Sequence, residues 1–314
     1  MIDLSSAISQ MGMMLIVVAI GYLAGRLKYL NEHATDGLNK LLMNICLPCL
    51  IIGSVAPLEI EHAETQIIVT FILGFIQFTI FMLVSIGCNH LFKTPQDQRA
   101  LYIFMNICTN TGFLGVPILQ TIYGDSTVLA ASIFVMMSNL YIGSIGFMIL
   151  DAHNHKTESG RPSFSLKTLL NTPLIACTFA LIVFLLGITF PPIIQNTMEF
   201  VGGVCPPVAM LIVGAVLSRA NLLKVVTEKR MYGYIVVRQL ILPIVSYFIL
   251  SALYIDPIVI YVYVIMCAAP IGSMVPAFAG IYKHDVELAA TGTALSTVCF
   301  FVIVPILIVV MALW

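Results

Sequence analysis

Long apolar segments that carry almost no charge follow one another along the whole 314-residue chain. An α-helix needs about 20 apolar residues to cross the hydrocarbon core of a membrane. Only 9% of the residues are charged, whereas soluble domains carry about 25%. So few charges cannot cover a surface that faces water, which excludes a soluble globular enzyme and a disordered protein. The formal net charge of −1 also argues against a basic surface for nucleic acid.

The charge-poor segments predict an all-α polytopic membrane protein with ten transmembrane helices. The connections between them are too short for a separate soluble domain. The N-terminal segment lacks a cationic start and a small-residue cleavage site, so we expect it to be retained as the first span. The ten expected spans are Leu4–Gly25, Leu41–Leu58, Thr65–Asn89, Ala100–Gly124, Ser126–Leu150, Leu169–Pro191, Phe200–Ser218, Met231–Ile255, Pro257–Tyr282 and Leu288–Trp314.

The positions of Lys and Arg predict the orientation of these spans. If ten spans alternate across the membrane, all 14 of these cations lie nearest to connections on one side. The other side holds only acids, among them Glu59, Asp125 and Asp256. Because Lys and Arg are retained in cytoplasmic loops, we expect a protein of the plasma (inner) membrane with both termini outside and residues 151–168 in the cytoplasm.

The two halves of the sequence resemble each other at a fixed offset. Pro276 aligns with Pro117, and Pro207 aligns with Pro48, each 159 positions apart. A duplicated unit of five spans is upside down in its second copy, and inverted repeats are typical of secondary transporters. The chain then divides into a first repeat, residues 1–150, a cytoplasmic loop, residues 151–168, and an inverted second repeat, residues 169–314.

In each repeat, one span is interrupted by glycine and proline at mid-membrane depth. Pro117 in the fourth span and Pro276 in the ninth each follow a polar or glycine-containing stretch. Proline removes a helical hydrogen bond, and a pair of broken helices is a pointer to a transporter's substrate site. The N-terminal ends of half-helices favour an anion, although the prolines could also be kinks that only serve helix packing. The candidate substrate-binding residues in these two spans are Asn110, Thr111, Gly112, Pro117, Gly272, Ser273 and Pro276.

The chain contains GYLAGRLKYLNEHATDGLNKLLMNICLPCLI near the start, NTGFLGVPILQTIYGDS in the fourth span and VGGVCPPVAMLIVGAVL in the seventh. These segments resemble the auxin efflux carrier family, within the bile/arsenite/riboflavin transporter superfold. The resemblance covers nearly the whole chain and implies an inverted five-plus-five repeat whose broken helices 4 and 9 cross at their prolines. It also implies a scaffold of helices 1, 2, 6 and 7, which pairs two subunits in a homodimer, and a mobile transport unit of helices 3–5 and 8–10.

The same resemblance implies a function. It implies a secondary transporter that moves a small organic anion, a mono- or dicarboxylate of the auxin or malate kind, by an elevator-type mechanism. The short central loop resembles the bacterial, malate permease-like form. Two further asparagines match family positions: Asn139 in the fifth span as a substrate-facing residue, and Asn44 in the scaffold wall. The third span differs from that of plant members because it contains no charged residue.

Arg238 is the one cation inside an expected span. Its side chain could extend along the apolar helix to the cytoplasmic interface, or it could attract an anion near the site. Two other functions stay open: a Na⁺- or proton-coupled symporter of the bile-acid carrier type, and a passive channel. Because no catalytic, metal-binding or cofactor-binding pattern occurs in the sequence, we expect no enzyme activity, no metal and no cofactor. The expected partners are the lipid bilayer, the small organic anion and a second subunit, with no nucleic acid.

Overall fold

The computed structural model describes residues 4–58, 63–151, 172–219 and 229–313. Within these ranges the regular structure is helical, apart from one isolated β-bridge between Thr109 and Ile271. The prediction of an all-helical chain is therefore confirmed for the described residues. Six helical stretches are long and apolar enough to cross a membrane: Glu32–Val55, Thr65–Leu91, Asp125–Leu150, Pro192–Arg219, Lys229–Ala252 and Val286–Leu313. Shorter apolar helices cover Gly12–Arg26, Thr172–Leu185 and Pro257–Ala268.

The first half of the chain contains twelve elements in the described ranges, α-helices (α) and shorter π- or 3₁₀-helical pieces (η). They are α1 (Leu4–Arg26), α2 (Glu32–Leu41), η1 (Leu42–Cys46), α3 (Leu47–Val55), α4 (Ala63–Leu91), α5 (Arg99–Ile107), η2 (Thr111–Gly115), α6 (Val116–Tyr123), η3 (Asp125–Thr127), α7 (Val128–Tyr141) and η4 (Ile142–Gly146), followed by the short α8 (Phe147–Asp151). The second half contains α10 (Thr172–Leu185), α11 (Pro192–Gly202), α12 (Cys205–Arg219), α14 (Lys229–Ile235), η6 (Val236–Ile241), α15 (Leu242–Ala252), α16 (Pro257–Ala268), α17 (Val275–Ile281) and α18 (Val286–Leu313).

The second expected span begins earlier than its apolar sequence indicates. The helix starts at Glu32 instead of Leu41 and continues through η1 into α3. Asn31 caps its N-terminus, because its side-chain oxygen accepts a hydrogen bond from the Ala34 amide at 2.9 Å. This cap stabilises the polar first turn of α2, so the helix can begin before the apolar sequence does.

The Pro191–Pro192 pair begins a helix and does not end one. The sixth expected span stops at Leu185, and Gly187 follows in a left-handed conformation with φ 61°. α11 then begins at Pro192, several residues before the expected start of the seventh span at Phe200. Proline is favourable in the first turn of a helix, where the missing N–H would have no partner.

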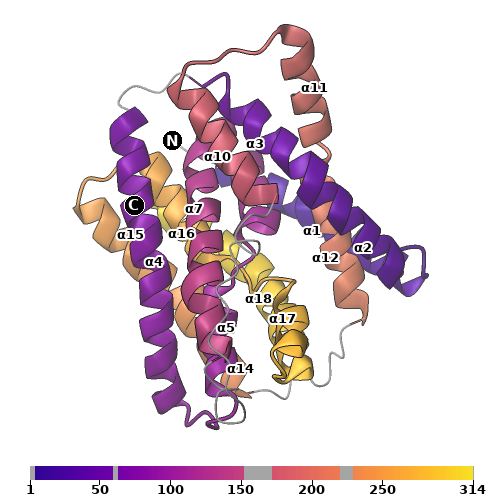
Figure 1. Ribbon diagram of the computed structural model, residues 1–314, viewed down its shortest axis with the longest axis vertical. Helices are drawn as coiled ribbons and strands as arrows, with labels where there is room; N and C mark the ends of the chain where they lie inside the picture. Colours follow the sequence, from indigo (N-terminus) through magenta and orange to yellow (C-terminus); the bar gives the residue numbers. More distant parts are fainter. Residues whose placement is uncertain (1–3, 59–62, 152–171, 220–228, 314) are drawn as a thin grey trace.

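Two sets of helices pack closely within themselves (Figure 1). In one set α1 runs along α12, and α10 and α11 pack on α3. In the other set α4 packs on α5 and α7, α15 packs on α16, and α17 packs on α18. The two sets meet where α10 and α3 contact α7, and where α1 contacts α18.

Glycines allow the backbones of α1 and α12 to come into direct contact. A Cβ atom added to Gly214 would lie 2.0 Å from the Val18 carbonyl oxygen, and one added to Gly21 would lie 2.2 Å from the Leu211 carbonyl oxygen. Helices inside membranes associate through close packing of small residues, because lipid offers no hydrophobic driving force between them. α1 and α12 therefore form a tight pair.

Candidate functional site

The fourth and ninth expected spans are each broken into two helices. α5 ends at Ile107, and the backbone is non-helical at Cys108 (φ −78°, ψ 83°) and at Asn110 (φ −85°, ψ 51°). The helix resumes at Thr111 with η2. α16 ends at Ala268, and α17 begins only at Val275. Both segments are thus interrupted at the polar or glycine-containing stretches from which the sequence predicted a substrate site.

The two breaks pair with each other around the β-bridge. The Asn110 amide donates a hydrogen bond to the Pro270 carbonyl at 2.8 Å, and the Gly272 amide donates to the Cys108 carbonyl at 2.7 Å. We call this pairing of residues 108–110 with residues 270–272 the crossing. Irregular backbone at membrane depth is tolerated only where its polar groups are satisfied by protein or line a cavity, and the crossing satisfies these groups by joining the two breaks.

The crossing does not lie at the two prolines expected to mark it. Pro117 and Pro276 occupy the first turns of α6 and α17, several residues after the breaks. Pro276 is tolerated because the missing N–H of a proline costs nothing in the first turn of a helix that follows a break. Pro117 instead follows the π-helical turn η2 within the continuous helical stretch 111–123. The proline that belongs to the crossing itself is Pro270, whose carbonyl accepts the Asn110 amide.

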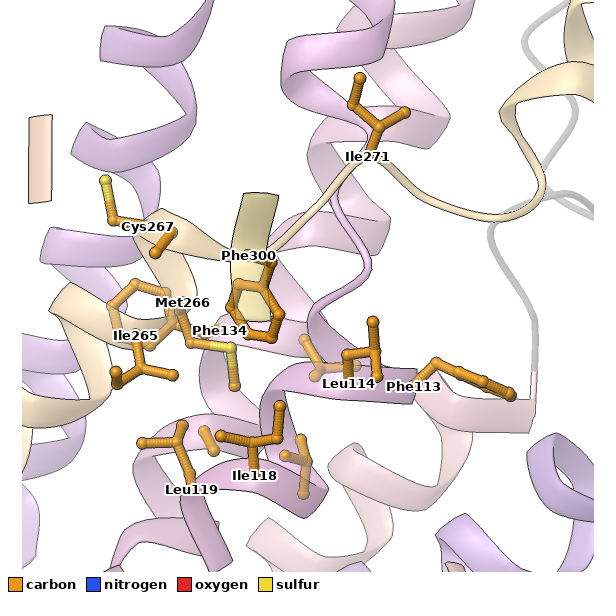
Figure 2. Packing of buried hydrophobic residues seen from close by; sticks show 14 of the residues in the cluster. Phe113, Leu114, Ile118, Leu119, Phe134, Ile265, Met266, Cys267, Ile271 and Phe300 are labelled. Carbon is orange, nitrogen blue, oxygen red and sulfur yellow. The ribbon is translucent and has the colours of Figure 1, made fainter. Parts of the chain in front are cut away.

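Apolar side chains support the crossing from one side (Figure 2). Ile271 lies on one of the two extended segments, while Phe134, Met266 and Phe300 gather beneath it toward the helix that carries Leu114. All five of these side chains are at most 3% exposed. The polar contacts of the crossing are therefore held against a packed and apolar support.

Arg238 reaches the crossing from η6. It is only 3% exposed. Its guanidinium donates to the Ala269 carbonyl and, at 3.5 Å, to the Asn106 carbonyl, and it lies 5.4 Å from the centroid of the Phe81 ring. Of the two alternatives left open for this side chain, extension to the cytoplasmic interface is wrong, because the carbonyl groups at the ends of α5 and α16 hold it inside the protein.

The neighbouring Gln239 and the more distant Ser296 complete the contacts around the breaks. The Gln239 side-chain amide donates to the Ala268 carbonyl at 2.9 Å and to the Ser296 carbonyl at 3.2 Å. The Ser296 hydroxyl accepts a hydrogen bond from the Ile271 amide at 3.0 Å. Neither Gln239 nor Ser296 was among the residues predicted for the site. Gln239 could have been predicted from the sequence, because it forms a polar Arg–Gln pair with Arg238 inside an apolar span.

The helix ends and Arg238 together determine the charge of the crossing. The C-terminal ends of α5 and α16 each carry roughly −0.5 of a unit charge, so the +1 of Arg238 offsets both. Arg238 forms no ion pair with any carboxylate of the described residues. The helices η2 and α17 begin directly after the two breaks, so their N-terminal ends lie next to this region.

The crossing brings together most of the candidate residues. Asn110 is half-buried and immediately precedes η2, which begins with Thr111 and Gly112. A Cβ on Gly112 would be in ordinary contact, 3.6 Å, with the Leu47 side chain of α3. Gly272 is buried in the crossing, and the adjacent Ser273 is exposed.

The two remaining asparagines make contacts elsewhere. The Asn139 side-chain amide donates to the Val135 carbonyl of its own helix at 2.8 Å. Asn44 lies in η1, where its amide donates to the Lys40 carbonyl at 2.9 Å and its oxygen accepts from the Thr172 hydroxyl at 2.6 Å. The contacts of Asn44 link η1 to α10 and do not reach the crossing.

Comparison with known proteins agrees with a transporter architecture. A family model described as membrane transport protein matches residues 6–308. The chain is similar to the uncharacterized transporter YfdV of Escherichia coli (strain K12), with 26% identity over 212 residues that span 65% of this chain and 66% of that protein. It is also similar to the uncharacterized transporter MJ1031 of Methanocaldococcus jannaschii, with 23% identity over 311 residues that span 96% of this chain and 95% of that protein. A match over nearly the whole chain, together with the apolar helices, shows that the protein is an integral, multi-pass member of the membrane transport protein family, the auxin efflux carrier family.

Proposed function

We propose that this transporter is a secondary carrier of a small organic anion, a mono- or dicarboxylate of auxin-like or malate-like chemistry, which binds at the crossing. One observation supports this most: Arg238 is buried next to two helix ends without a carboxylate partner among the described residues. A buried cation that only offsets helix ends leaves the half-helix N-termini free to attract a carboxylate. Asn110 adds a side-chain amide that can donate to the bound anion.

We further propose that the anion moves by an elevator-type mechanism between ten spans arranged as two inverted repeats. The scaffold would consist of α1, α2–α3, α10 and α11–α12, and the transport unit would consist of the elements that carry the crossing. The close packing of α1 on α12, and of α10 and α11 on α3, supports a rigid scaffold. Fluorophores on α12 and α5 should change their separation when substrate is added, and a constant separation would contradict the proposal.

The scaffold is also the proposed surface for a homodimer. α11 protrudes from the rest of the helices (Figure 1), and its Ile193 and Phe200 are 77% and 82% exposed. The mass of the purified protein in nanodiscs distinguishes a dimer from a monomer, and a monomer at all concentrations would rule this assembly out.

We propose an orientation with both termini outside. The end of α4, the start of α14 and the turn between α17 and α18 lie toward one end of the molecule (Figure 1), and Lys93, Lys229, Arg230 and Lys283 lie in these regions. Such a concentration of cations is typical of the cytoplasmic side.

Single-cysteine labelling tests the orientation. Asp256 and Lys283 flank the α16–α17 segment, and both are exposed. In a cysteine-free background, a membrane-impermeant maleimide added to intact cells should label Asp256→Cys and leave Lys283→Cys unlabelled until the membrane is opened. The opposite pattern would overturn the proposed orientation.

A ligand-stabilisation screen of the purified protein tests the proposed function. A carboxylate that binds the folded state at about a hundred times its Kd should stabilise it by about 2.7 kcal/mol, which raises the melting temperature. The matched control is the carboxamide analogue of each compound, which has a similar shape and no charge. Equal stabilisation by acid and amide would contradict an anion site.

The same screen separates the uncoupled carrier from a Na⁺-coupled symporter. The crossing has a fixed positive charge in Arg238, so replacing Na⁺ by choline should leave the affinity for the anion unchanged. A tenfold higher affinity in Na⁺ corresponds to a coupling free energy of about 1.4 kcal/mol and would favour the symporter.

A further inference from the structure

The guanidinium of Arg238 lies where backbone carbonyl groups from two broken helices converge. One carbonyl, that of Asn106, belongs to the last turn of α5, and the other, that of Ala269, directly follows α16. Carbonyl oxygens at the ends of interrupted helices are the groups with which transporters coordinate Na⁺. In this protein an arginine side chain binds to those oxygens.

The surroundings of the guanidinium are those of an enclosed cation site. Arg238 is 3% exposed, and the ring of Phe81, which is 1% exposed, lies 5.4 Å from the guanidinium carbon. The face of an aromatic ring attracts a cation. The adjacent carbonyl of Ala268 is bound by Gln239, so the two consecutive carbonyl groups at the C-terminal end of α16 each have a side-chain donor.

We propose that the guanidinium of Arg238 is a tethered substitute for a coupling cation. It binds carbonyl groups of both broken helices and thereby holds the crossing together, and it supplies permanently the positive charge that a symporter takes from Na⁺. One consequence of this inference, an affinity for the anion that does not depend on Na⁺, rests on the proposed function. The cation site itself can be tested without any substrate. Arg238 acts on the substrate through the crossing, so it is a positioning residue.

The proposal predicts that a free guanidinium ion can replace the missing side chain. Arg238→Ala should leave a site lined by the two carbonyl groups and the Phe81 ring. Guanidinium chloride at low millimolar concentration should then raise the melting temperature of the purified variant by several degrees, since a ligand of the folded state stabilises it. Choline chloride at the same concentration should have no such effect.

Two controls isolate the site from general effects of the salt. The wild-type protein has its site filled by its own side chain, so guanidinium should not stabilise it. Arg230→Ala removes an exposed arginine eight residues earlier on the same helical stretch and should respond like the wild type. An identical response of Arg238→Ala, Arg230→Ala and the wild type to guanidinium would overturn the proposal.

Substitutions that retain or remove the charge separate a cation site from simple packing. Arg238→Lys retains a charge and should fold and bind the anion, whereas Arg238→Met retains much of the volume and should bind it at least about tenfold more weakly. Guanidinium should restore most of the anion affinity of Arg238→Ala. Wild-type affinity in Arg238→Met, or a loss of folded protein in Arg238→Lys as well as in Arg238→Ala, would contradict the proposal, because shape and not charge would then be what the crossing requires. If guanidinium stabilises Arg238→Ala while no carboxylate stabilises the wild type, the cation site stands and the proposed substrate class fails.

Discussion

Asn110→Ala should lower the affinity for the transported anion by roughly tenfold to a hundredfold, with little loss of folded protein. A hydrogen bond to a charged group is worth about 1.5–3 kcal/mol, and the substitution removes one such donor from the crossing. The backbone of Asn110 keeps its own contacts: its amide donates to the Pro270 carbonyl, and its carbonyl accepts from the Leu114 amide at 3.2 Å. None of these contacts needs the side chain, so the crossing should persist in the variant.

Uptake of a labelled carboxylate into proteoliposomes measures this effect. Asn196→Ala is the matched control, because Asn196 is an exposed asparagine on α11, in the proposed scaffold. The control should transport like the wild type. Wild-type uptake by Asn110→Ala would mean that the side-chain amide of Asn110 does not contact the substrate. A reduced amount of folded protein would mean that this side chain serves packing.

The sequence could predict the helices and the two interruptions because both follow from local properties. Apolar length predicts a membrane helix, and a polar, glycine-containing stretch disfavours a regular α-helix; here the helix breaks at residues 108–110 and resumes as the π-helical η2. Local rules also explain where the boundaries were wrong. The cap at Asn31 extends a helix into polar sequence, and Pro192 starts a helix where a proline was expected to end one.

The partners at the crossing could not be predicted in the same way. Arg238 contacts Asn106 and Ala269, and Ser296 contacts Ile271. These pairs depend on how distant helices are placed in space, and no periodicity along the chain contains that information. The sequence left two alternatives for Arg238 for this reason: the helix ends that bind its guanidinium come from other segments of the chain.

The central claim, that an organic anion binds at the crossing, can be tested at Ser273. This residue is exposed and directly follows Gly272, whose amide donates to the Cys108 carbonyl. Ser273→Cys changes one atom and places a thiol beside the proposed site. In an otherwise cysteine-free protein, a carboxylate at ten times its Kd leaves about one site in eleven free, so it should slow alkylation of this thiol by about tenfold.

The control is Asp256→Cys, which lies at the start of α16, at the opposite end of this helix from the crossing. The same carboxylate should not change its rate of alkylation. The decisive measurement is therefore the ratio of alkylation rates with and without a carboxylate that stabilises the protein. We predict a ratio of about one tenth at position 273 and of one at position 256. A ratio of one at both positions, with a carboxylate that demonstrably binds, would place the anion elsewhere and contradict this account.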